Sequence, residues 1–104
     1  MTATRTQSPE LIAAKCATRA ACAEGRLRIA RTVIEGSTGN VRPDIKTIVE
    51  GIAKNAAHDV CLIDEMIAAD AALVGFYNYK AMQSLWRAQD AAQRCADLLS
   101  EAGR

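Results

Sequence analysis

The sequence predicts an all-α protein, an antiparallel bundle of three long amphipathic helices with alanine-rich seams, and two observations carry this prediction. Three long stretches repeat apolar residues at steps of three and four, which return side chains to one face of a helix. Turn-forming residues gather between these stretches, and short connections make neighbouring helices antiparallel. A bundle of four helices stays open, because Gly51 or the polar segment 55–59 could divide the second helix.

The first helix is expected to begin at Ser8-Pro9-Glu10, which offers a hydroxyl cap, a proline at the first helical position and a carboxylate near the positive end of the helix dipole. It runs to Glu35, where Gly36 suits a left-handed cap. Its apolar seam crosses Gly25 without interruption, which favours one helix over two. The seam contains Ile12, Cys16, Ala20, Ala23, Leu27, Ala30 and Ile34.

The segment 37–43 is the clearest loop, and Pro43 suits the start of a second helix with Asp44 in its first turn. This helix is expected to end near Asp70 or Leu73. Because its face is built from isoleucine and valine, we expect it to form the centre of the core. Its seam contains Ile45, Val49, Ile52, Ala56, Val60, Ile63 and Ile67.

The third helix follows a tight connection predicted at residues 73–78, where Gly75 and Asn78 bracket two aromatic residues, and continues to about Ala102. Its seam contains Val74, Tyr77, Ala81, Leu85, Ala88, Ala92, Cys95 and Leu99.

The length of 104 residues predicts one domain spanning residues 1–104, with a flexible N-terminus at residues 1–7. Half of the residues are apolar, but many are alanine and only four are aromatic, so the core is expected to be thin. A thin core gains stability from association, which favours a homo-oligomer.

The N-terminal segment 1–7 has no apolar run of signal-peptide length, and no apolar run in the chain approaches the length that spans a membrane. Four cysteines, with no close metal-binding pair among them, fit reduced thiols better than a disulfide framework. These features predict a cytoplasmic protein. The cysteines are Cys16, Cys22, Cys61 and Cys95.

The first helix carries a second, weaker apolar strip formed by Leu11, Cys22, Ile29 and Val33. A helix in a three-helix bundle needs only one buried face, so an additional strip indicates self-association or a partner protein. Cys22, Ile29 and Val33 are therefore candidate partner-binding residues.

Three cations, Lys15, Arg19 and Arg26, project beside that strip. Residues 1–42 hold seven cations against three carboxylates, so the helix could lie against the more acidic remainder of the chain or bind an external anion. Arginine forks bind phosphate oxygens, and phosphate-dependent binding of nucleic acid or a nucleotide is therefore an alternative function. No aromatic residue lies near these arginines, which argues against base stacking.

Met82 and Trp86 lie at the edge of the third helix's buried face, where such residues often anchor interfaces. The alternative is that Trp86 covers the rim of the core. On the second helix, Asn55 and Asp59 lie near the edge of the seam, where they either form boundary hydrogen bonds or set the helix register.

His58 is the only histidine, and it projects away from the seam with Lys54 one turn earlier. This pair permits a second alternative function, histidine phosphotransfer, against the simpler interpretation of a solvated side chain. His58 and Cys61 form only half of a metal site, so we expect neither a metal nor a cofactor.

No phosphate-binding loop, nucleophile motif or di-iron helix motif occurs in the chain, which argues against an enzyme. The sequence therefore predicts a small binding or regulatory module that acts through protein–protein contacts.

Overall fold

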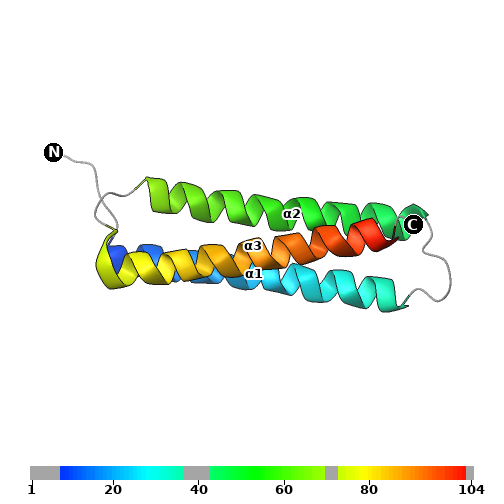
Figure 1. Ribbon diagram of the computed structural model, residues 1–104, viewed down its shortest axis with the longest axis horizontal. Coiled ribbons are helices and arrows are strands. Elements are labelled where there is room, and N and C mark those ends of the chain that lie inside the picture. Colours follow the sequence, from blue (N-terminus) through cyan, green and yellow to red (C-terminus); the bar gives the residue numbers. More distant parts are fainter. Residues whose placement is uncertain (1–7, 37–42, 70–72, 103–104) are drawn as a thin grey trace.

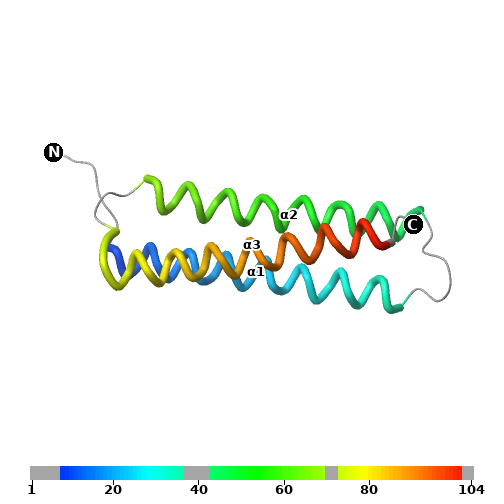
Figure 2. Tube along the Cα trace, viewed as in Figure 1, coloured from blue at the N-terminus to red at the C-terminus, as the bar shows by residue number. Residues whose placement is uncertain are grey.

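A computed structural model describes residues 8–36, 43–69 and 73–102, and these residues contain three α-helices and no β-strand. They are α1 (Pro9–Gly36), α2 (Pro43–Ala68) and α3 (Gly75–Ala102), and each packs against the other two. Successive helices run in opposite directions along one rod (Figures 1 and 2). The predicted antiparallel three-helix bundle is confirmed. The four-helix alternative is wrong, because α2 continues through Gly51 and residues 55–59.

The start of α1 is the one predicted from its capping residues. The backbone N–H of Leu11 donates to Oγ of Ser8 over 3.1 Å, which satisfies a donor that the first helical turn leaves unpaired. The helix also passes through Gly25. The prediction of a left-handed cap at Gly36 is wrong, because Gly36 is the last helical residue and has no positive φ.

The connection before α3 lies earlier in the chain than predicted. Gly75, with a φ of 61°, starts the helix, so residues 76–78 belong to α3 and not to a turn. The second helix ends at Ala68, before the predicted end near Asp70 or Leu73. The predicted flexible segment 1–7 and most of the predicted loop 37–43 lie outside the described residues.

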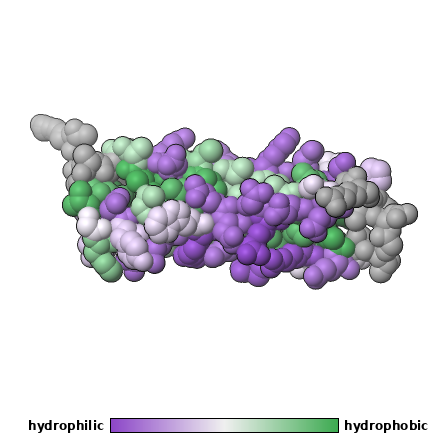
Figure 3. All heavy atoms as spheres, in the orientation of Figure 1, coloured by the Kyte–Doolittle hydropathy of each residue, from purple (hydrophilic) through white to green (hydrophobic). Residues whose placement is uncertain are grey.

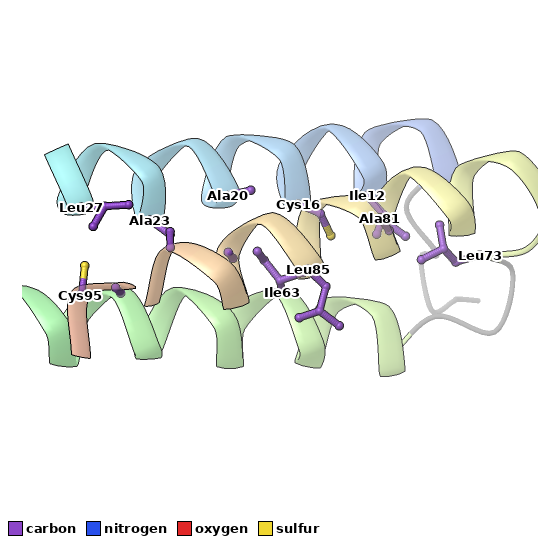
Figure 4. Packing of buried hydrophobic residues seen from close by; sticks show 13 residues of the cluster. Ile12, Cys16, Ala20, Ala23, Leu27, Ile63, Leu73, Ala81, Leu85 and Cys95 are labelled. Atoms are coloured by element: carbon purple, nitrogen blue, oxygen red, sulfur yellow. The ribbon is translucent and has the colours of Figure 1, made fainter. Parts of the chain in front are cut away.

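The three helices share one thin core, and eight of the sixteen apolar residues buried in the described part of the chain are alanine. Figure 4 shows these short side chains pointing into the space between the helices, with Ile63 among the few larger ones. Small side chains let helix axes approach closely but remove little apolar surface from water.

The expectation that the second helix forms the centre of the core is wrong. The buried apolar residues of α1 number seven, whereas α2 buries Val49, Ala56 and Ile63. Larger α2 side chains such as Ile45 and Ile52 are only partly buried.

The core pattern of the third helix begins one residue earlier than predicted. Val74 is 67% exposed, whereas its neighbour Leu73 is buried in the core cluster. Both residues precede the helix, so helical spacing does not determine which of them faces inward.

The bundle is a rod, and every helix has an outward face. Its radius of gyration is 16.5 Å, compared with about 13 Å for a compact domain of this size. Figure 3 shows hydrophobic and weakly polar residues around the end that contains the start of α3, and hydrophilic residues over the middle of the same face. None of the described helices combines the length and apolarity that crossing a membrane requires.

Candidate functional site

A buried carboxylate lies between α1 and α2. The side chain of Asp59 is 1% exposed and accepts hydrogen bonds from two arginines of α1. Nε of Arg26 lies 2.7 Å from Oδ2, and Nη2 makes a longer contact of 3.5 Å with Oδ1. Nη1 of Arg19 lies 3.3 Å from Oδ1. We call Asp59, Arg19 and Arg26 the Asp59 clamp.

The clamp compensates a charge that would otherwise be costly to bury. Removing a carboxylate from water costs several kcal/mol unless cations and hydrogen-bond donors replace the lost solvent. The hydrogen bond to Asp59 raises the pKa of Arg26, which keeps this guanidinium charged. Arg19 and Arg26 lie two helical turns apart, so sliding α2 by one turn would move Asp59 away from one of them. The clamp therefore fixes the register of α1 on α2.

Two members of the predicted anion-binding stripe pair with a carboxylate in the structure. Arg19 and Arg26 face Asp59, whereas Lys15 is exposed beside a shallow hollow that Arg19, Leu11 and Met66 also line. An external phosphate would have to compete with Asp59 for both arginines. Binding of nucleic acid or a nucleotide by this stripe stays a prediction.

The second apolar strip of α1 lies on the outside of the bundle. Ile29 is 56% exposed, Cys22 is exposed and Val33 is partly exposed. On α2, Ile48 is 49% exposed. The structure thus leaves these side chains accessible, and their role in binding a partner stays a prediction.

The outward face of α3 carries more aromatic surface than the sequence analysis assigned to it. Trp86 is 53% exposed, while Met82 is partly buried against the core. Phe76 and Tyr79 are 65% and 54% exposed and lie on the same helix. The sequence prediction missed Phe76 and Tyr79 because it placed Phe76 in a turn. The spacing of residues 76, 79, 83 and 86 would have indicated that they share one face of a helix.

An exposed ion pair joins α1 to α3 next to Trp86. The guanidinium of Arg87 donates two hydrogen bonds to the carboxylate of Glu24, with Nε 3.1 Å from Oε2. The hydrogen bond lowers the pKa of Glu24 and raises that of Arg87. Because both side chains remain over one-third exposed, the pair contributes at most about 1 kcal/mol to stability. Shallow hollows lie on either side of it, and Trp86 lines both.

His58 and Lys54 are both exposed on α2, as is Cys61. Among the residues that the structure describes, no three histidine, cysteine or acidic side chains come together as metal ligands. Phosphotransfer through His58 stays a prediction.

The cysteines fall into two environments that alkylation can distinguish. Cys16 and Cys95 are fully buried, and burial raises the pKa of both thiols; for Cys95, nearby Arg31 and Arg26 partly oppose the increase. Cys22 and Cys61 are exposed. Iodoacetamide should therefore modify Cys22 and Cys61 in the native protein, and Cys16 and Cys95 only after denaturant is added. Peptide mass spectrometry checks this, and native labelling of Cys16 as fast as that of Cys22 would contradict the packing described.

Bundles of this kind serve many unrelated functions, so the fold alone does not identify one. No protein-family model, curated protein sequence or solved structure matches this chain.

Proposed function

We propose that the protein is a non-enzymatic helical binding or regulatory module, which acts through protein–protein contacts and forms a homo-oligomer. The supporting observation is that large apolar side chains lie outside a core made mostly of small ones. Ile29 and Trp86 are each more than half exposed, while half of the buried apolar residues are alanine. Grouped apolar side chains on the surface of a small protein commonly mark an interaction site.

Association also suits the energetics of this rod. An alanine-rich core buries little apolar area per residue, so the stability that it provides is limited. Covering an outward helix face with another chain removes further apolar surface from water. Exposed apolar side chains therefore favour a stable complex, in which the contact buries them, over a transient contact between polar surfaces.

We place this function in the cytoplasm. The four cysteines, Cys16, Cys22, Cys61 and Cys95, are unpaired. Unpaired thiols are typical of a reducing compartment. The cytoplasmic location is proposed from the unpaired cysteines alone.

Single charged substitutions at exposed apolar positions test the proposal. At least one of Trp86→Glu and Ile29→Glu should lower the mass of the assembly in sedimentation velocity, because a carboxylate would have to be buried where the substituted residue lies in the contact. Gln89→Glu and Thr32→Glu are matched controls at exposed polar positions of α3 and α1. Circular dichroism should show the same helicity in all four variants. A native mass that neither Trp86→Glu nor Ile29→Glu changes would count against the proposal.

A further inference from the structure

We propose that the outward face of α3 binds the same face of a second copy of this chain, with the two α3 helices antiparallel. This inference rests on the proposed function and names its partner and surface. The surface is a row of five residues that we call the aromatic seam: Phe76, Tyr79, Gln83, Trp86 and Asp90.

The spacing of the aromatic seam is that of a helix-pairing surface. Its steps are three, four, three and four residues, the repeat that keeps a seam facing a second helix in a coiled coil. The seam lies away from the buried residues of α3, and all five members are exposed. Nε2 of Gln83 donates to the hydroxyl of Tyr79 over 3.1 Å, which links two members on the surface. The face is therefore organised for helix pairing but covered by neither α1 nor α2.

The composition of the seam selects an antiparallel pairing. A two-fold axis at Gln83 places Tyr79 opposite Trp86 of the partner subunit, and Phe76 opposite Asp90 of the partner subunit. Two layers of paired aromatic rings then flank a central pair of glutamines. A parallel pairing would place the two Asp90 carboxylates against each other, which is unfavourable.

Opposite charges meet at both ends of this arrangement. Nζ of Lys80 lies 5.4 Å from the centroid of the Phe76 ring, so Asp90 of the partner subunit approaches Lys80 as it approaches Phe76. Asp90 also contacts Arg94 within its own helix, but that pair is exposed and contributes little to stability. Arg87, a third cation of α3, is already paired with Glu24.

A hollow next to the seam provides space for an aromatic ring of the second copy. It lies between α1 and α3, where the short side chains of Ala13 and Ala17 face Gln83 and Trp86. Aromatic side chains that enter such recesses commonly supply most of the binding energy of an interface.

Charge exchange across the seam tests the pairing. Lys80→Glu alone and Asp90→Lys alone should each weaken dimerisation by about tenfold or more, because each places like charges together at both ends of the seam. The double variant Lys80→Glu/Asp90→Lys should recover most of the native affinity. Sedimentation equilibrium over a range of concentrations measures all three. The double variant Lys46→Glu/Asp64→Lys is the matched control, because both residues are exposed on α2. It should leave the dimerisation constant unchanged.

A cross-link at the two-fold axis supplies a second measurement. Gln83→Cys should form a disulfide with the same residue of a second copy, identified as a linked peptide by mass spectrometry. Gln93→Cys, three residues beyond Asp90, should not link to itself, because the two copies of this residue would lie far apart. Failure of both charge rescue and the Gln83→Cys cross-link would overturn the α3 pairing.

The two proposals fail in different ways. A dimer that Trp86→Glu leaves intact and Ile29→Glu dissociates would overturn the α3 pairing while supporting self-association through α1. A native chain that stays monomeric at every concentration would overturn the α3 pairing and the proposed homo-oligomer together.

Discussion

Arg26→Met is expected to destabilise the bundle by about 3–5 kcal/mol, because it leaves a buried carboxylate without its strongest partner. Asp59 is 1% exposed, and its shortest hydrogen bond, 2.7 Å, comes from Arg26. Arg19 alone would hold the carboxylate through one contact of 3.3 Å. Urea unfolding followed by circular dichroism, at one fixed protein concentration, measures the loss.

Three further variants separate this effect from a general loss of charge. Asp59→Asn should cost less, because the arginine side chains that it leaves unpaired are 39% and 32% exposed and can be hydrated. Asp59→Leu combined with Arg26→Met should recover much of the lost stability, since no charge then remains buried. Arg87→Met, which breaks an exposed pair, should cost at most about 1 kcal/mol. An Arg26→Met effect no larger than that of Arg87→Met would contradict the role given to the clamp.

Ile63→Ala is expected to destabilise the protein by about 2–5 kcal/mol, through lost apolar burial and the cavity that remains. Ile63 is the largest fully buried side chain. The core cluster that contains Ile63 includes many alanines, whose side chains are too short to fill the space. A loss of this size is a large fraction of the roughly 5–15 kcal/mol that stabilises a typical domain.

Ile48→Ala provides the matched control for this prediction. Ile48 lies on the same helix and is 49% exposed, so its truncation should change the free energy of unfolding by about 0.5 kcal/mol or less. Thermal unfolding of the two variants at equal concentration compares them directly. Equal losses would mean that the core does not contain the contacts described.

The fold was predictable from the sequence because helical spacing reports which residues share a face. Cys16, Ala20 and Ala88 were assigned to the core by that spacing and are fully buried. The core prediction failed where the chain is not helical. Val74 was assigned to the core but is exposed, and its neighbour Leu73 is buried instead. The prediction also failed at Gly75, because a glycine that suits a turn equally suits the first residue of a helix.

The Asp59 clamp was not predictable to the same degree. The sequence suggested that the basic first helix could lie against the acidic remainder, and that Asp59 could form boundary hydrogen bonds. It did not indicate that Asp59 would be buried or that Arg19 and Arg26 would share it, because those residues lie 40 and 33 positions away. Such a pairing depends on how far one helix is shifted along its axis relative to the other. The periodicity of a single helix gives no information about this shift.

Outward apolar residues were partly predictable. The spacing of α1 placed Ile29 beside the main seam, and its side chain is exposed. Tyr79 was not noticed as part of a surface, because the preceding segment was interpreted as a turn. Their exposure shows that these side chains are accessible.

We propose that the outward apolar side chains serve association and that the core serves folding. Sedimentation equilibrium of the native chain and the double variant Ile29→Glu/Trp86→Glu tests it most directly. The account predicts that the native chain forms a concentration-dependent oligomer, while the double variant has the mass of one chain and keeps native helicity. A native chain that is monomeric throughout, or a double variant that retains the native mass, would contradict the claim.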